Sequence, residues 1–211
     1  MTRLLILGAP GAGKGTQSKL ISEKLGIPHI STGDILRSEI SSGTPLGNKV
    51  KEYVESGKLV PDEIIADVLL EEIKKEKYKN GYILDGFPRN LNQVKIMEEK
   101  GIEIDKVIFI DTSEDEILRR VTGRRVCLNC GSVYNIYYNP PKEENKCNKC
   151  GSELSQRKDD SEEVVKSRLE TFNKDTLPVV KYYESKKILL IVNGNKSFDD
   201  IKNEILSVLG V

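Results

Sequence analysis

Residues 2–16 read Thr-Arg-Leu-Leu-Ile-Leu-Gly-Ala-Pro-Gly-Ala-Gly-Lys-Gly-Thr, so a short apolar run leads directly into closely spaced glycines. The apolar run 2–7 is typical of a buried parallel strand, and the period of residues 16–25 predicts a helix. Between them, glycines let backbone N–H groups turn inward around phosphate oxygens, and the helix N-terminus adds positive potential. Lys14 would reach the outer phosphates. We therefore predict a nucleotide site at Gly11, Ala12, Gly13, Lys14, Gly15 and Thr16.

The rest of the chain repeats this alternation of strand and helix. Further apolar runs predict strands at 28–30, 82–84, 107–110 and 188–192. Segments of helical period lie between and after them, at 62–77, 90–100, 114–122, 161–185 and 198–209. Pro178 predicts a kink or break in the helix over 161–185. Alternating strands and helices indicate βαβ units, so we predict an α/β fold with a three-layer core and a five-stranded parallel sheet.

Two stretches interrupt the alternation and are interpreted as insertions. Residues 31–60 have helical pieces but no obvious strand, and residues 123–160 contain all four cysteines. The predicted core is therefore formed by 1–30, 61–122 and 161–211.

The cysteines form two pairs, Cys127 with Cys130 and Cys147 with Cys150, separated by 16 residues. This C-x2-C-x16-C-x2-C spacing is typical of a tetrahedral zinc site with four thiolate ligands. Such a site has no open coordination position, so the metal would be structural, and iron is the chemical alternative to zinc. A disulfide framework is not expected in a cytoplasmic chain of this length.

Composition argues against some classes of partner. The 211 residues carry 33 Lys and Arg and 33 Asp and Glu, so no net charge attracts nucleic acid or an acidic membrane. No apolar run reaches the roughly 18 residues of a membrane helix, and the apolar run at 4–7 is too short for a secretory signal. We expect a cytoplasmic monomer that binds neither nucleic acid nor membrane.

Several further motifs follow the glycine-rich loop in a characteristic order. They are Ser31-Thr-Gly-Asp-Ile-Leu-Arg37, Gly57-Lys-Leu-Val60, Leu84-Asp-Gly-Phe-Pro-Arg89 with Gln93, Gly123-Arg-Arg125 and Arg157-Lys-Asp-Asp160. Over nearly the whole chain, this pattern resembles the adenylate kinase family of P-loop nucleoside monophosphate kinases, in its bacterial form with a long metal-binding lid. The family's loop also has glycine after the lysine. The resemblance implies transfer of a phosphoryl group between Mg²⁺-bound ATP and AMP to give two ADP, an AMP-binding insertion at 31–60 and a zinc-binding lid at 123–160.

The resemblance also implies residue roles. Contacts with AMP would come from Thr32, Arg37, Lys58, Leu59, Val60, Gly86, Phe87, Pro88, Arg89, Gln93, Arg157 and Arg168. Contacts with ATP outside the loop would come from Arg124, Val133, Tyr134 and Lys196. The catalytic set would be Lys14, Asp85, Arg89, Arg124, Arg157 and Arg168. Guanidinium groups suit a reaction that gathers many phosphate charges, and Asp85 would meet Mg²⁺ through water, by analogy with a Walker B acid.

Two alternatives remain open from the sequence. The first is a kinase of the same kind acting on UMP, CMP or GMP, against which Thr32, Gln93 and the long lid favour AMP. The second is a nucleic-acid-binding module that uses the cysteine knuckles with the adjacent Arg119, Arg120, Arg124 and Arg125, against which the zero net charge speaks. The single histidine, His29, lies at the end of a short strand and is interpreted as structural.

Overall fold

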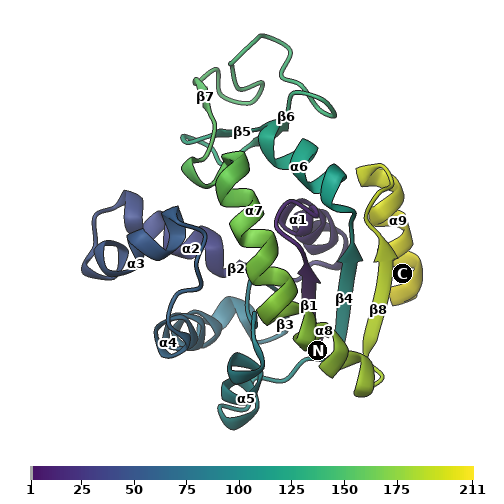
Figure 1. Ribbon diagram of the computed structural model, residues 1–211. Coiled ribbons are helices and arrows are strands. Elements are labelled where there is room, and N and C mark those ends of the chain that lie inside the picture. Colours follow the sequence, from purple (N-terminus) through teal and green to yellow (C-terminus); the bar gives the residue numbers. More distant parts are fainter. Residues whose placement is uncertain (1) are drawn as a thin grey trace.

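A computed structural model describes residues 2–211 and contains two separate sheets (Figure 1). The larger one has five parallel strands in the order β2-β3-β1-β4-β8. Its strands are β1 (Thr2–Gly8), β2 (His29–Ser31), β3 (Gly81–Asp85), β4 (Lys106–Asp111) and β8 (Leu189–Asn193). The predicted α/β fold and all five strands are confirmed.

Helices cover both faces of this sheet. Along β1, Leu4 and Ile6 pack on one face with α1 (Lys14–Leu25) and α9 (Phe198–Leu209), and Leu5 and Leu7 pack on the other. This alternation follows from the period of two along a strand. The second face is covered by α4 (Asp62–Ile73), α5 (Leu91–Glu99), α6 (Glu114–Thr122), α7 (Glu162–Thr171) and α8 (Leu177–Ser185).

The break predicted near Pro178 is present as a change of helical geometry. A π-helical turn, η3 (Phe172–Thr176), joins α7 to α8, and Pro178 is in the first turn of α8. Proline lacks the N–H that would continue an α-helix, so the hydrogen-bond pattern changes before it.

The segment 31–60 contains two helices, α2 (Thr32–Ser41) and α3 (Pro45–Glu55), which lie beside the sheet (Figure 1). The Thr44 side chain caps α3 by accepting a hydrogen bond from Gly47 N at 3.0 Å. Gly47 lies directly against the end of α2, and a Cβ atom there would be 2.2 Å from the carbonyl oxygen of Glu39. Only glycine allows this approach of the two helices.

The segment 123–160 contains a small antiparallel sheet in the order β6-β5-β7. The strands are β5 (Arg124–Cys127), β6 (Val133–Asn135) and β7 (Leu154–Ser155). Two to four residues are too few to show a period in the sequence, so these strands were not predicted. Short 3₁₀ turns, η1 (Glu76–Tyr78) and η2 (Lys158–Asp160), complete the elements.

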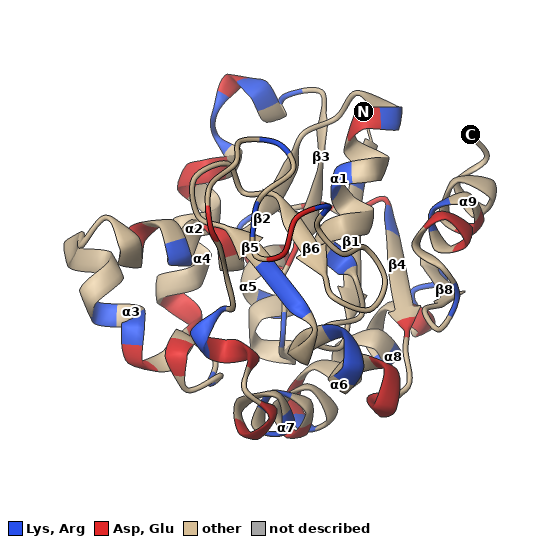
Figure 2. Ribbon diagram, turned by 90° about the horizontal axis from the view of Figure 1, so that it is seen from above, with Lys and Arg blue, Asp and Glu red and all other residues tan. Residues whose placement is uncertain are grey.

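Basic and acidic segments are interspersed in the view of Figure 2. Among the described residues, no helix is long and apolar enough to cross a membrane.

We predict that Gly47→Ala destabilises the protein by about 1–3 kcal/mol, because the added methyl group must push α3 away from the backbone of α2. Thermal unfolding should show a midpoint lower by roughly 2–10 °C. The control is Lys49→Ala, at an exposed position of the same helix. Equal thermal midpoints for the two variants would show that the close approach of α2 and α3 at Gly47 does not require glycine.

Candidate active site and metal centre

The glycine-rich loop joins β1 to α1 at the carboxyl end of a central strand, the edge at which parallel α/β sheets bind ligands. Gly11 and Gly13 have φ angles of 83° and 94°, in the left-handed region that favours glycine. A Cβ atom on Gly11 would also lie 2.4 Å from Val121 Cγ2 of α6. The curled loop therefore needs its glycines for both backbone conformation and space.

Lys14 is held at the mouth of the loop. Its Nζ donates hydrogen bonds to the carbonyl oxygens of Gly8 and Ala9, each at 2.9 Å. Burial lowers the pKa of Lys14 to about 8, although the nearby Asp85 carboxylate acts to raise it. Both hydrogen-bond acceptors are neutral, so an anionic phosphate would supply charge compensation that the loop itself does not.

Asp85 ends β3 beside the same loop. Its Oδ2 would be 3.6 Å from a Cβ atom on Gly15 and lies 3.7 Å from His29 Nε2. Burial acts to raise the pKa of Asp85, but His29 and Lys14 lower it, and the net shift is downward. A buried, ionised carboxylate beside a phosphate loop is the kind of oxygen donor that suits Mg²⁺ brought in with a nucleotide.

A cavity lies between the helical insertion and the end of β3. Most residues predicted to bind AMP line it, namely Thr32, Arg37, Lys58, Leu59, Val60, Gly86, Arg89, Gln93 and Arg168. Three do not: Phe87 is buried in the core, Pro88 lines a neighbouring cavity, and Arg157 lies outside both.

The neighbouring cavity connects this pocket to the glycine-rich loop. It is lined by Gly8, Pro10 and Lys14 of the loop region and also by Arg89 and Arg168, which line the first cavity as well. The two arginines therefore stand where a ligand on the loop and a ligand in the insertion cavity would meet.

The arginines around these cavities form a dense group of positive charge. Arg168 pairs with Asp159 at 2.8 Å, Arg37 with Asp34 at 2.6 Å, Arg157 with Asp34 at 3.7 Å, and Arg124 Nε bonds to Asp160 Oδ2 at 2.8 Å. Among residues 2–211, no carboxylate forms an ion pair with Arg89, whose Nε bonds to the Gly86 carbonyl oxygen at 2.7 Å.

The pKa values in this group reflect the crowding of cations. Burial, together with neighbouring arginines, lowers the pKa of Arg157 and of Arg168 to about 10. Burial also lowers the pKa of Arg89. These groups remain protonated at neutral pH, and bound phosphate anions would relieve their mutual repulsion.

The segment 123–160 also touches the helical insertion. Lys158 Nζ lies 3.0 Å from Glu55 Oε1, and Arg157 shares Asp34 with Arg37. Asp159 of the same segment also lines the insertion cavity, so the two insertions meet at that cavity. A segment in this position is suited to excluding water from a reaction site when a ligand is bound.

The residues predicted to bind ATP outside the loop lie in different surroundings and line neither of these two cavities. Lys196 follows β8, with its Nζ 2.7 Å from Glu204, and Val133 is exposed. The Tyr134 ring is buried among the cysteines, with its hydroxyl 3.4 Å from Cys147 Sγ. Only the backbone of Tyr134 is therefore suited to a nucleotide contact.

Arg120 contacts the glycine-rich loop, although the sequence analysis did not assign it to the nucleotide site. It donates to the carbonyl oxygens of Ala12 in the loop and Lys196 after β8, at 3.4 and 3.2 Å. Its guanidinium also lies 5.1 Å from the centre of the Phe198 ring. The only available signal was the i, i+4 pair with Glu116, bonded at 2.7 Å, which is common on helices.

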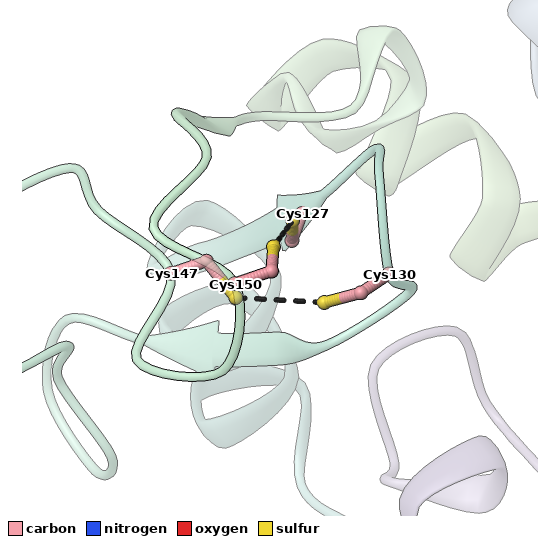
Figure 3. A group of neighbouring side chains, drawn as sticks. All are labelled: Cys127, Cys130, Cys147 and Cys150. Atoms are coloured by element: carbon pink, nitrogen blue, oxygen red, sulfur yellow. Dashed lines mark hydrogen bonds between the residues drawn. The ribbon is translucent and has the colours of Figure 1, made fainter.

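The four cysteines of the segment 123–160 form a compact group (Figure 3). All four Sγ atoms lie within 4.8 Å of one another, with Cys127 and Cys150 at 3.4 Å and Cys130 and Cys147 at 3.5 Å. Tetrahedral Zn–S bonds of about 2.3 Å require sulfur atoms about 3.8 Å apart, so the group fits such an ion. Hydrogen bonds from the Tyr134 hydroxyl and from the backbone N–H groups of Lys149 and Cys150 lower the pKa of Cys147 to about 5. For Cys127, the backbone N–H of Cys130 acts to lower the pKa, whereas burial and the Cys150 thiol act to raise it, and the net shift is upward.

Backbone geometry around the cysteines supports the same conclusion. The two knuckles have the same form: Gly131 N bonds to the Cys127 carbonyl oxygen at 2.9 Å, and Gly151 N bonds to that of Cys147 at 2.8 Å. Both glycines have φ near 70°, at 69° and 73°. The repeated turn brings each cysteine pair to one point, as a shared metal ion requires.

Comparisons with known proteins agree with this geometry. The sequence model of the family described as "Adenylate kinase" matches residues 6–188. The chain is 48% identical to "Adenylate kinase" of Caldicellulosiruptor bescii over 213 residues, covering 99% of each chain. It is 50% identical to that of Clostridium botulinum (strain 657 / Type Ba4) over 212 residues, 99% of this chain and 98% of the relative. It is 48% identical to that of Thermodesulfovibrio yellowstonii, with 98% of each chain covered.

We predict that Cys147→Ser, or a strong chelator applied to the unmodified protein, lowers the thermal midpoint by about 10 °C. This corresponds to about 4 kcal/mol, the stabilisation by a ligand present at a thousand times its dissociation constant. The cause is that a segment with only Cys127, Tyr134, Cys147 and Leu154 buried in its own cluster loses its cross-link.

The matched control is Leu128→Ser, at an exposed position between two of the cysteines. Bound metal, measured by atomic absorption, should stay at one ion in the control and fall in Cys147→Ser. A wild-type midpoint that is insensitive to chelation, with no metal bound, would refute the metal centre.

Proposed function

Because this chain belongs to the adenylate kinase family, we propose that it catalyses the reversible, Mg²⁺-dependent reaction ATP + AMP = 2 ADP and so balances the adenine nucleotides. The protein is a phosphotransferase. The observation that carries the mechanism is that Arg89 and Arg168 line both the cavity next to the glycine-rich loop and the cavity of the insertion. Two phosphorylated ligands, one in each cavity, would have their phosphates facing each other at these arginines.

In this proposal, ATP lies with its phosphates on the loop from Gly11 to Thr16, and Lys14 bonds to the outer phosphate oxygens. AMP lies in the insertion cavity with its phosphate against Arg37, Arg89 and Arg168. The attacking atom is an oxygen of the AMP phosphate, which is already ionised at neutral pH, so no general base is needed. Catalysis then rests on positioning and on positive charge held around the transferring group.

Mg²⁺, when bound with ATP, supplies charge neutralisation of the β- and γ-phosphates. Asp85 is the residue that we assign to it, through water, because its ionised carboxylate lies beside Gly15. Arg124 at the start of the lid bonds to Asp160, and Arg157 near its end pairs with Asp34 of the other insertion; both would complete the charge around the transferring phosphoryl group.

The lid segment 123–160 is proposed to hold a structural zinc ion on its four cysteines. Four thiolates favour zinc and leave no position for a substrate, so the ion would fix the shape of the lid without entering the chemistry. Iron is the other metal that such a site accepts, and metal analysis of the purified protein separates the two.

The arginines beside the cysteine knuckles do not support the competing interpretation, a nucleic-acid-binding module. Arg120 is buried against Glu116, Arg124 bonds to Asp160, and Arg119 lies over the Tyr137 and Tyr138 rings. These cations have intramolecular partners. We also propose that the chain acts as a monomer, because the sequence shows no large apolar surface run that would form an interface. The cytoplasmic location expected from the sequence stays a prediction.

The first functional prediction concerns the acceptor. A coupled assay with ATP as donor should show AMP as the best acceptor among AMP, CMP, UMP and GMP. Thr32→Ala should raise the KM for AMP by about fivefold or more with little change in the KM for ATP, because Thr32 lines only the insertion cavity. Preference for another nucleotide, or an equal change for donor and acceptor, would contradict this assignment.

A second prediction concerns Lys14. Lys14→Met should lower kcat by about 10²- to 10³-fold or more, because preorganised charge on the phosphates is removed. It should not lower the thermal midpoint of the nucleotide-free protein at pH 7, since the pKa of buried Lys14 is depressed to about 8.

The stability comparison has a defined pH dependence. A lysine with a folded pKa below its unfolded value is a cost to the folded state at low pH, and the cost disappears as pH rises from about 8 toward about 10.5. Any stability advantage of Lys14→Met over the wild type should therefore shrink across this window. A constant difference from pH 7 to pH 10 would show that the depressed pKa of Lys14 is not its cause.

A further inference from the structure

The carboxylate of Asp62 accepts several hydrogen bonds just outside the insertion cavity, in which we place the acceptor AMP. Asp62 begins α4, and its Oδ1 accepts from Asn90 Nδ2 at 2.9 Å and Gln93 Nε2 at 2.7 Å. Its Oδ2 accepts from Asn92 Nδ2 at 2.7 Å. Partial burial acts to raise the pKa of Asp62, but the bonds from these three amides lower it, and the net shift is downward. At neutral pH the group is ionised and can only accept hydrogen bonds.

Gln93 is held at both ends of its amide. Its Nε2 donates to Asp62, and its Oε1 accepts from the backbone N–H of Arg89 at 2.6 Å. Reversing the amide would place Oε1 against a carboxylate oxygen and Nε2 against an N–H group, so two favourable contacts would become repulsive. The side chain is buried, at 2% exposure, which makes both losses costly. The orientation of this amide is therefore fixed.

The fixed amide still has hydrogen-bonding capacity for a ligand. Each end has used one position, so one N–H and one oxygen lone pair remain, and Gln93 lines the acceptor cavity. An amide edge can pair with a 6-aminopurine, which presents an N6–H donor beside the N1 acceptor. The reversed amide would instead pair with a 6-oxopurine, which presents the O6 acceptor beside an N1–H donor. Which purine fits depends on which way the amide points.

We propose that Asp62 is a specificity-determining positioning residue of the acceptor site. By holding Nε2 of Gln93 toward itself, while the Arg89 N–H holds Oε1, Asp62 sets the amide so that 6-aminopurine monophosphates are accepted and 6-oxopurine monophosphates are disfavoured. The proposal rests on the proposed function for its ligand class. Asp62 is not among the residues that line the cavity, so it acts through Gln93 and not by direct contact.

The test compares AMP with inosine monophosphate (IMP), a 6-oxopurine acceptor, in binding and in turnover. Isothermal titration gives the ratio of the IMP and AMP dissociation constants, and the coupled assay gives the KM for AMP and for ATP. In Asp62→Ser, whose hydroxyl can both donate and accept, the ratio should fall by about tenfold, with the KM for ATP unchanged. Asp62→Ala is measured as well, so that the result does not depend on one variant folding.

Two further variants show whether the acceptor oxygen is what matters. Asp62→Asn keeps one acceptor oxygen for Gln93 and should retain most of the wild-type ratio. Asp67→Asn, an exposed acid on the same helix, should retain all of it. If the ratio of the IMP and AMP dissociation constants is unchanged in the Ser and Ala variants, the proposal is overturned. This includes the case in which the binding of AMP and of IMP weakens by the same factor.

The outcomes separate this inference from the proposed function. A wild type that binds AMP more tightly than IMP but transfers no phosphoryl group would contradict the proposed reaction, and a reduced ratio in Asp62→Ser would still support the role of Asp62. A wild type that phosphorylates AMP with no loss of discrimination in either Asp62 variant would contradict the role of Asp62 alone.

Discussion

The accumulation of buried positive charge around one small volume is the constraint on which the rest of the site depends. Lys14, Arg89 and Arg168 all lose solvation there, and burial lowers the pKa of each. Isolated charges in such a place are costly, and several like charges are more so. The chain offsets part of this cost with Asp34, Asp85, Asp159 and Asp160, and bound phosphates would offset the remainder. A site built in this way favours ligands that bring many negative charges together.

The small sheet of the cysteine-containing segment meets a different requirement. The residues that close over the phosphates must belong to a segment able to keep its shape away from the main core. That segment has only a small buried cluster of its own, formed by Cys127, Tyr134, Cys147 and Leu154. Four thiolates around one ion would replace the missing hydrophobic core. Tyr134 links the two tasks, because its ring packs on the metal cluster and its backbone belongs to β6, paired with the strand that begins at Arg124.

On the acceptor side, a network of hydrogen bonds adds precise positioning to the positive charge of the arginines. Gln93 lies between the backbone of Arg89 and the carboxylate of Asp62, and Asn90 both caps α5 and bonds to Asp62. The same few hydrogen bonds thus fix the start of a helix, the backbone of Arg89, which we assign to the AMP phosphate, and the amide of Gln93, which we assign to the base. Networks of this kind stabilise one arrangement only when every member is satisfied. Here Asp62 satisfies three amides at once.

The sheet, the glycine-rich loop and the cluster of four cysteines could be predicted from the sequence, because each depends on local patterns. Apolar runs such as 4–7 specify buried strands, the glycine spacing from Gly8 to Gly15 specifies a loop that side chains would block, and cysteine pairs two residues apart specify a knuckle. The tertiary structure alone decided what depends on contacts between distant residues. Arg120 reaches Ala12 and Lys196, the Tyr134 ring turns to Cys147, and Asp62 sets the amide of Gln93. A single charged or polar residue in a sequence looks the same whether it is solvated or bonded across the fold, and only folding supplies its partner.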